Sequence, residues 1–343
     1  MLTTLLIIQA VAAPLWSEAQ VVGQIEAVSL DELSGLTSSG VIPDLLWGIN
    51  DSPDPVLFAI DSSGDDLDRL SVEGVENYDW EDLSGGPCPD FVGACACLYI
   101  ADSGDDDASR ENGRILILPE PEAGSFSSNT EAPMQIWYTT SSGLVDVEAM
   151  VVDPDTLDIF LFEKTTEPLS SVFRISGPHL PSSNESPTMA VNVASVDLTS
   201  AVDRSIGAAT ISPNGRLLAI RTDSDLLLYE GDEGVIEMLN RAPASIPTVV
   251  DPHGEAASFS FDGTAIYLSG EGNNSNISAV FADPAEPQNR VTEECELTST
   301  CGCSTSNNGA KRLLISIITM FGLLLFRRKN WDYSSTATGF NKA

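Results

Sequence analysis

The sequence predicts an all-β protein folded as a five-bladed β-propeller, and three observations lead to that prediction. A short unit recurs along the chain, in which an acidic residue opens an apolar run that ends in a tight turn before a second apolar run. The turns Asp262-Gly263 and Asn214-Gly215 favour β-hairpins, because both positions of such pairs tolerate positive φ. Five such units recur at intervals of roughly 50–65 residues, which is typical of a radial β-repeat with one blade per unit.

Apolar runs bounded by turn residues predict the strands of each blade in order. They cover residues 33–38, 45–49, 56–60 and 67–72 in blade one; the segment after Glu81 and residues 97–101, 114–118 and 134–139 in blade two; residues 149–152, 159–163, 171–175 and 189–198 in blade three; residues 208–211, 217–221, 225–229 and 235–239 in blade four; and residues 256–260, 265–269 and 277–281 in blade five.

Blade five is therefore one strand short, and residues 21–28 are expected to supply the missing strand. That pairing would close the ring and leave no long exposed edge. The total is then twenty strands. A six-bladed ring is the alternative, if blade two or residues 201–204 hide a further blade.

The charge of the chain is strongly negative, at −35, with 51 acidic residues against 16 basic ones. Six of the basic residues lie at or beyond Lys311, and Lys164 is the one lysine before that point. Such a body repels phosphate backbones, which argues against nucleic-acid binding. It suits cation binding or a solvated extracellular surface.

The two ends of the chain predict export and membrane attachment. Residues 1–19 resemble a secretory signal whose apolar stretch is too short to span a bilayer, with cleavage expected after Ala12 or Ala19. The propeller then covers residues 20–292. A polar, cysteine-containing linker (293–310), a short hydrophobic sorting or transmembrane helix with a basic flank (311–329) and a tail (330–343) follow.

The glutamates that open the units are the candidate metal ligands. In a propeller the innermost strand of every blade lines the channel, so Glu32, Glu81, Glu148 and Glu255 should form a ring at one mouth, with Gly207 in the fifth place. Asp82 is an alternative to Glu81. Converging carboxylates repel one another, and Ca²⁺ is the hard cation that takes several oxygen ligands in loose geometry. Carboxylates that cap backbone amides between blades are the structural alternative.

The second strand of each hairpin ends at the same mouth, because it runs antiparallel to the first. Its end residues, together with one nearby histidine, are the candidate substrate-binding residues: Asp51, Asp102, Lys164, Arg221, His253 and Glu271. No Gly-x-Ser-x-Gly, Walker or His-Glu-x-x-His motif occurs. Any hydrolysis would therefore use metal-activated water.

Three cysteines lie in the insertion of blade two. Export makes a disulfide plausible there, either Cys88 with Cys97 or Cys88 with Cys95.

The body, with Asp31-Glu-Leu-Ser-Gly-Leu and the Glu148-Ala and Glu255-Ala openings, resembles five-bladed propellers of the calcium-activated nucleotidase (apyrase) family. That resemblance implies a central Ca²⁺ and hydrolysis of nucleotide phosphate chains at the mouth. The pieces Asp79-Trp-Glu-Asp-Leu and Tyr99-Ile-Ala-Asp-Ser-Gly-Asp are similar to those of exported phytase-like and esterase-like propellers. This second likeness implies an acidic, metal-dependent mouth.

The tail resembles the MYXO-CTERM class of bacterial surface-sorting signals, on the order of Cys301-Gly-Cys303, a short apolar run and an arginine cluster. The resemblance implies cleavage near the cysteines by a sorting protease and a lipid on Cys301 or Cys303. It places the protein at the bacterial cell surface or outer membrane. An ordinary short membrane anchor is the alternative.

Two functions follow from these expectations. The first is an exported, surface-anchored, calcium-binding propeller that acts as a binding or scaffold module for an extracellular ligand. The second is a calcium-dependent hydrolase of phosphate esters or anhydrides. Whether Lys164 and Arg221 face the same cleft as the glutamates separates the two.

Overall fold

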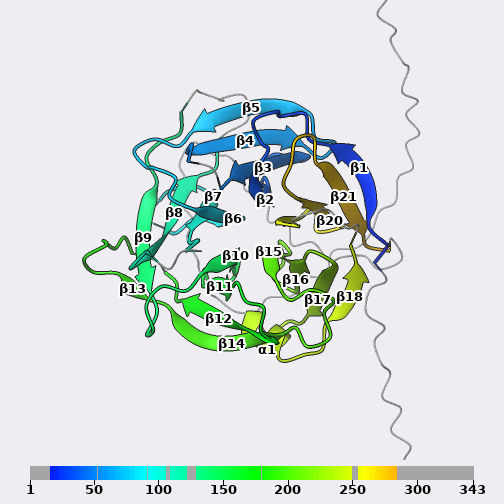
Figure 1. The fold of residues 1–343 in the computed structure, drawn as a ribbon. Coiled ribbons are helices and arrows are strands. Elements are labelled where there is room, and N and C mark those ends of the chain that lie inside the picture. The colour runs from blue at the N-terminus through cyan, green and yellow to red at the C-terminus, as the bar shows by residue number, and fades with distance from the viewer. Residues whose placement is uncertain are drawn as a thin grey trace, which may run out of the picture. The chain divides into compact units, whose positions relative to one another are not determined.

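The computed structural model describes residues 16–283 except 52, 91, 106–108, 122–128, 179 and 249–253, and it shows five β-sheets around a central axis (Figure 1). The five-bladed β-propeller is confirmed. The six-bladed alternative is wrong, because the described strands form five sheets that close into one ring.

The structure defines the following elements among the described residues: β1 (Gln20–Gln24), β2 (Leu33–Ser38), β3 (Leu45–Asn50), β4 (Val56–Asp61), β5 (Asp66–Ser71), β6 (Trp80–Pro87), β7 (Ala96–Asp102), β8 (Gly113–Pro119), β9 (Met134–Thr139), β10 (Val147–Val152), β11 (Ile159–Glu163), β12 (Leu169–Ile175), β13 (Thr188–Met189), β14 (Val191–Asp197), β15 (Ile206–Ile211), β16 (Leu217–Thr222), β17 (Asp225–Glu230), α1 (Val235–Leu239), β18 (Ala244–Pro247), β19 (Ala256–Phe259), β20 (Ala265–Ser269) and β21 (Asn276–Phe281).

Apart from β1, which joins blade five, and β13, which joins blade two, the strands of each sheet follow chain order outward from the axis. Their strand orders are β2-β3-β4-β5, β6-β7-β8-β9-β13, β10-β11-β12-β14, β15-β16-β17-β18 and β19-β20-β21-β1 for blades one to five. The strands β2, β6, β10, β15 and β19 lie nearest the axis (Figure 1). Neighbouring inner strands approach closely there, since a Cβ added at Gly35 would lie 2.5 Å from the backbone nitrogen of Leu83.

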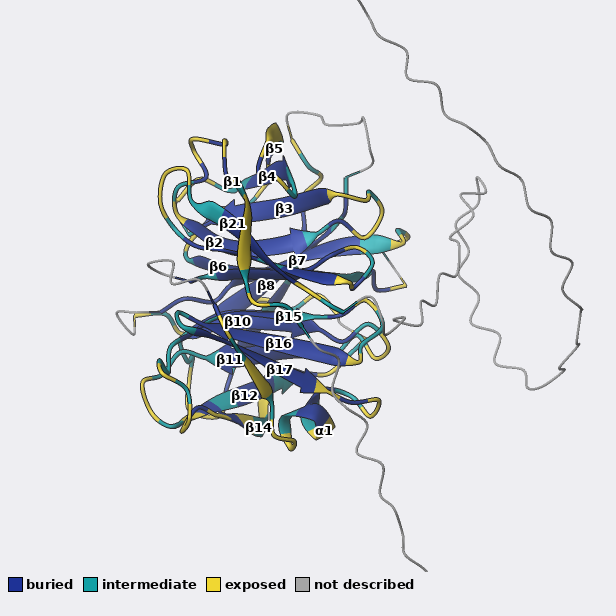
Figure 2. Cartoon of the chain, turned by 90° about the vertical axis from the view of Figure 1, so that its right-hand side faces the viewer, coloured by how far each residue is buried: buried dark blue, intermediate teal, exposed yellow. Residues whose placement is uncertain are grey.

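Five hydrophobic clusters fill the five spaces between neighbouring blades. Strands contribute alternate residues to the two sides: in β7, Tyr99 packs toward blade three, whereas Leu98 and Ile100 pack toward blade one. Because successive side chains point to opposite faces, a strand buried on both faces reads as a continuous apolar run. Figure 2 shows the resulting buried inner strands, with exposed residues in the loops and on outermost strands such as β1.

The first strand closes the ring. β1 pairs antiparallel with β21 and supplies the outer strand of blade five. This confirms the role expected for residues 21–28, with the strand shifted slightly toward the N-terminus. Before β1, Trp16 forms a bridge with Ala282 and packs edge-on against Phe259, with ring centroids 6.2 Å apart.

Two outer elements differ from the predictions. Residues 235–239 form the helix α1, not a strand, and β18 is the outer strand of blade four. Val235 and Met238 are the buried residues of α1, which is helical spacing, but so short an apolar run does not reveal its period. The predicted strand 189–198 divides, because β13 pairs with β9 of blade two before β14 joins blade three. The described residues therefore contain twenty-one strands instead of twenty.

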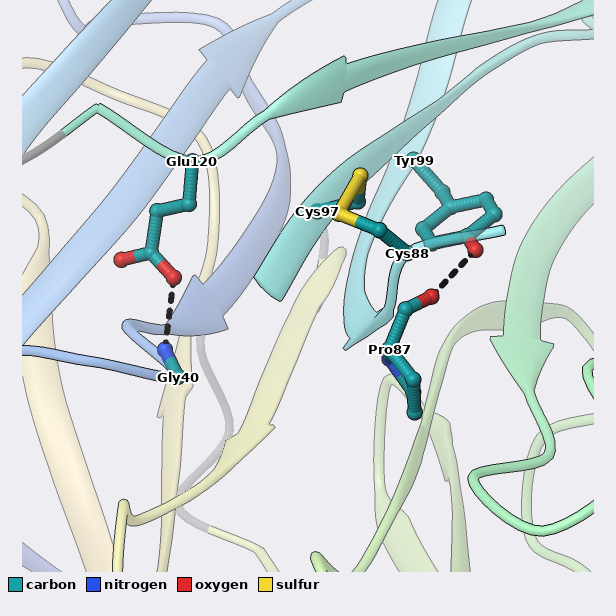
Figure 3. Close-up of a disulfide and its surroundings, with 6 residues drawn as sticks. All are labelled: Gly40, Pro87, Cys88, Cys97, Tyr99 and Glu120. Carbon is teal, nitrogen blue, oxygen red and sulfur yellow. Dashed lines mark hydrogen bonds between the residues drawn. A yellow bond between two sulfur atoms is a disulfide. The ribbon is translucent and has the colours of Figure 1, made fainter. Parts of the chain in front are cut away.

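The insertion of blade two is held by a disulfide between Cys88 and Cys97, the first of the two pairings predicted (Figure 3). Cys95 is exposed and lies outside this disulfide. The Tyr99 hydroxyl donates a hydrogen bond to the Pro87 carbonyl oxygen at 2.6 Å, beside the bridge. On the other side, the Glu120 carboxylate accepts hydrogen bonds from Gly40 N at 2.8 Å and from Trp47 Nε1 at 2.9 Å, which ties blade two to blade one.

Several predicted features lie outside the described residues. They are most of the signal segment, the linker, the hydrophobic run, Cys301, Cys303 and His253. Among the described residues, no helix is long and apolar enough to cross a membrane.

Candidate functional site

The first strand of each blade begins at one end of the channel, and a β-bulge marks that beginning in blades one to four. The bulge residues are Ser34, Glu81, Glu148 and Gly207, and Glu255 immediately precedes β19 in blade five. An extra residue at a bulge re-aims the local side chains, and bulges are common next to functional sites. Glu81, Glu148 and Glu255 thus take equivalent places, which we call the lower tier.

Blade one departs from the predicted alignment, since Ser34 stands in the lower tier instead of Glu32. In blades one, three and five, a backbone hydrogen bond in the turn follows the last paired residues of the first two strands. Its donor is Asp153 N in blade three and Ser260 N in blade five, five residues after Glu148 and Glu255 respectively. In blade one it is donated by Ser39 N, five residues after Ser34. Gly40 lies one residue after Ser39, whereas Gly263 lies three residues after Ser260, so Glu32 has the same spacing to a glycine without the same register.

Glu32 belongs to a second level, the upper tier, together with Asp79 and Asp146. The backbone carbonyl of each accepts a hydrogen bond from the residue that follows the second strand: Asp51 N to Glu32 O at 3.1 Å, Ser103 N to Asp79 O at 3.0 Å, and Lys164 N to Asp146 O at 2.9 Å. Asp79 and Asp146 were missed from the sequence. The signal was present, because each precedes its lower-tier glutamate in an Asp-x-Glu triplet.

Three carboxylates converge between blades one and five. Oxygen atoms of Glu32, Asp51 and Glu271 all lie within 4.8 Å of one another, and we call these residues the rim cluster. Gly272 N donates to the Asp31 carbonyl at 2.8 Å, which holds the two blades together beside the cluster. Burial, followed by the negative charges of Glu32, Glu271 and Asp79, raises the pKa of Asp51 to about 6.

The lower tier is electrostatically joined to the rim cluster. Burial, and then the neighbouring Glu271 and Glu148, raise the pKa of Glu255. Burial, and then Glu148 and Asp79, raise the pKa of Glu81 well above its usual range. Lys164 opposes both shifts, and its Nζ lies 2.8 Å from Glu148 Oε1 with 37% of its side chain exposed. The two tiers and the rim cluster form one acidic mouth.

Three predicted site residues are engaged in structural contacts instead. The carboxylate of Asp82 is buried and accepts hydrogen bonds from Leu83 N and Met150 N, each at 2.7 Å. Asp102 is fully buried and forms two ion pairs: Arg110 Nη2 lies 2.9 Å from its Oδ1 atom, and Arg114 Nε lies 2.7 Å from its Oδ2 atom. Arg221 is also fully buried, and its Nη1 donates to the carbonyls of Ala256, at 2.8 Å, and Ser269. Asp82 therefore links blades two and three, and Arg221 links blades four and five.

The raised pKa values predict that the metal-free protein loses stability as pH rises from 5 to 8. A carboxyl with a raised pKa binds its proton more tightly in the folded state than in the unfolded state. The free energy of unfolding therefore begins to fall above the unfolded pKa of about 4, and the fall is complete above the folded pKa. Asp51 contributes between about pH 4 and about 6, and Glu81 and Glu255 continue the fall at higher pH. In EDTA we expect the melting midpoint to fall by about 3–6 °C, which corresponds to about 1–2 kcal/mol after allowance for solvent screening.

Differential scanning fluorimetry from pH 5 to 8 measures this effect. The double variant Glu81→Gln/Glu255→Gln should flatten the profile, because neither amide titrates. A midpoint that rises steadily over this range would contradict the prediction.

The fold and the mouth define the protein as a five-bladed β-propeller with an acidic end to its channel. No protein-family model matches the chain, and no curated protein matches it. Among solved structures, the chain is similar to the crystal structure of the RRP9 WD40 repeats, with 12% identity, a TM-score of 0.39, and coverage of 79% of this chain and 99% of that one.

Proposed function

We propose that the protein is a calcium-binding β-propeller that acts as a binding or scaffold module outside the cytoplasm. The observation that carries the proposal is the convergence of Glu32, Asp51 and Glu271 from two blades, with oxygens within 4.8 Å. Like charges at this separation destabilise one another unless they share protons or bind a cation. Three carboxylates offer up to six oxygens, which is the lower limit of the six to eight that Ca²⁺ takes.

The choice of calcium follows from the donor set. Among the described residues, the mouth offers carboxylates and no histidine or cysteine, and hard oxygen donors favour Ca²⁺ over zinc or copper. The rim cluster is half-exposed and loop-borne, which suits the loose geometry of Ca²⁺ better than the strict octahedron of Mg²⁺. Glu255 and Glu271 couple the ion electrostatically to the lower tier.

The arrangement of positive charge favours binding over phosphate hydrolysis. Hydrolysis of phosphate esters requires cationic groups aimed at the phosphate oxygens. Arg221, Arg110 and Arg114 make buried contacts to backbone carbonyls or to Asp102, and Lys164 is paired with Glu148. The calcium-dependent hydrolase is therefore the second candidate, in which Lys164 would leave Glu148 to contact the phosphate.

Export is supported by the Cys88–Cys97 disulfide, because disulfides persist in oxidising compartments. Anchoring through residues 311–329, and sorting at Cys301 or Cys303, complete the proposal. Of the two expected cleavage positions, the one after Ala12 retains Trp16 and its contact with Phe259, whereas cleavage after Ala19 removes it.

Isothermal titration with CaCl₂ and MgCl₂, paired with a phosphate-release assay on ATP and phytate, tests the function. We expect calcium to bind more tightly than magnesium, Asp51→Asn to weaken calcium binding at least about tenfold, and the assay to show no release. Asp66→Asn, an exposed carboxylate on β5 of the same blade, is the matched control and should bind as the parent does.

Absence of calcium binding, or equal weakening by the two substitutions, would refute the metal site. Calcium-dependent phosphate release that is lost in Lys164→Met would instead establish the hydrolase.

A further inference from the structure

A second cavity lies at the opposite end of the propeller from the acidic mouth. It has a volume of about 290 Å³ and is lined by the β2–β3 and β19–β20 turns of blades one and five, including Pro43, Asp44, Leu46, Phe261, Asp262 and Tyr267. This volume lies just below the range for small-molecule pockets, about 300–1,000 Å³, and suits a small group. The cavity is separate from the site described above, which lies where the inner strands begin.

The charged side chains that line the cavity, Asp44 and Asp262, are hydrogen-bond acceptors, and the phenol of Tyr267 lies in the same lining. The Ser62 hydroxyl donates to Asp44 Oδ1. Burial raises the pKa of the half-buried Tyr267; a hydrogen bond with Ser62 opposes the rise, and the negative charges of Asp44 and Asp262 add to it. The Asp262 Oδ1 atom accepts from Ser260 Oγ at 2.8 Å and from Thr264 N at 3.1 Å, which fixes this carboxylate in its turn. No lysine, arginine or histidine is among the residues that line the cavity.

The remaining wall is apolar. Phe261 is 39% exposed, and Pro43, Leu45 and Leu46 continue the apolar surface. An aromatic face attracts a cation held within about 6 Å of its centroid, and aliphatic walls accommodate the methylene stem of an alkylammonium group. The cavity thus pairs two carboxylates with an aromatic face and an aliphatic wall.

We propose that this cavity binds an alkylammonium group, of the kind carried by a lysine side chain or a free aliphatic amine. The absence of a lining cation disfavours an anion, and the two lining carboxylates disfavour a neutral apolar ligand, whose binding would leave them desolvated. A metal ion needs more ligands than two, and among the described residues the group of three acids close enough to hold one is the rim cluster. An organic cation with an apolar stem satisfies both walls at once.

Titration of the purified protein in EDTA with n-butylammonium, observed by NMR of ¹³C-labelled phenylalanine and tyrosine, tests the proposal. We expect saturable shifts of the Phe261 and Tyr267 signals at millimolar ligand and none with n-butanol. Phe261→Ala should weaken binding about 2–5-fold, and Asp44→Asn/Asp262→Asn at least about tenfold. Asparagine keeps Oδ1 as the acceptor for Ser260 and Thr264, so the turn is preserved.

Asp155→Asn is the matched control, because Asp155 takes the place of Asp262 in the turn of blade three. It should leave binding unchanged. The peptide acetyl-Gly-Lys-Gly-amide distinguishes the sources: binding tighter than n-butylammonium indicates a lysine-bearing partner, and weaker binding indicates a free amine. Absence of shifts, equal shifts with n-butanol, or equal weakening by Asp155→Asn would overturn the proposal. Because EDTA removes calcium throughout, this outcome is independent of the calcium experiment.

Discussion

Replacing Asp82 with alanine is expected to lower the free energy of unfolding by about 3–5 kcal/mol, one of the two largest effects we foresee. The carboxylate is buried near the channel axis and accepts hydrogen bonds from Met150 N of blade three and Leu83 N of its own blade. Alanine removes both acceptors and leaves buried N–H groups without partners. Urea denaturation followed by far-UV circular dichroism measures the loss.

Asp82→Asn is the informative control. Asparagine keeps one acceptor oxygen but presents an NH₂ group to the second donor, so we expect an intermediate loss of about 1–3 kcal/mol. Calcium affinity of the folded Asp82→Asn protein should equal that of the parent, because the side chain links blades and lies outside the rim cluster. A loss below about 1 kcal/mol in Asp82→Ala would mean that the inter-blade bond contributes little. A selective loss of calcium binding would return Asp82 to the metal ligands.

Calcium is expected to raise the melting midpoint of the protein by about 5–10 °C when free Ca²⁺ is held at 100 times its dissociation constant. A ligand that binds only the folded state at this excess stabilises it by about 2.7 kcal/mol, and a protein of this size gains about 2–4 °C per kcal/mol. The rim cluster joins blades one and five, where β1 closes the ring, so a calcium ion bound there would stiffen the closing blade. Scanning calorimetry with calcium and with EDTA measures the difference.

Glu271→Gln should abolish most of this increment, because it removes one of three converging carboxylates. Without calcium the same variant should be as stable as the parent or more so, since it also removes like-charge repulsion at Asp51 and Glu255. Glu26→Gln, at an exposed position after β1, serves as the control and should keep the full increment. A midpoint that does not respond to calcium would contradict the proposed metal site.

Local chemistry was enough to predict the blades. Asp-Gly and Asn-Gly turns specify hairpins within a few residues, and alternating contacts with both neighbouring blades make each buried strand a continuous apolar run. Residues 21–28 were expected to close the ring because blade five lacked a fourth strand, and β1 supplies it. The failures were short outer segments such as α1, where five residues do not establish a period.

The site was predicted less completely. Glu81, Glu148 and Glu255 occupy equivalent positions as expected, but the matching spacing in blade one selected Glu32, whereas the strand register selects Ser34. The place of the glycine within the turn caused that error, because Gly40 comes earlier in its turn than Gly263 does, and register depends on which residues pair across the hairpin. Arg221 and Asp102 were expected at the mouth from their place at strand ends, yet both side chains are buried in contacts with neighbouring segments.

The sequence by itself determined the number of blades and the repeated acids at the entrance of the channel, because both depend on residues close together in the chain. The closing strand followed from the count, since blade five was one strand short. Only the tertiary structure decided which acids meet, which are consumed by backbone donors, and where the second cavity forms. Those outcomes depend on contacts between blades, and side chains far apart in sequence meet there only after the ring has closed.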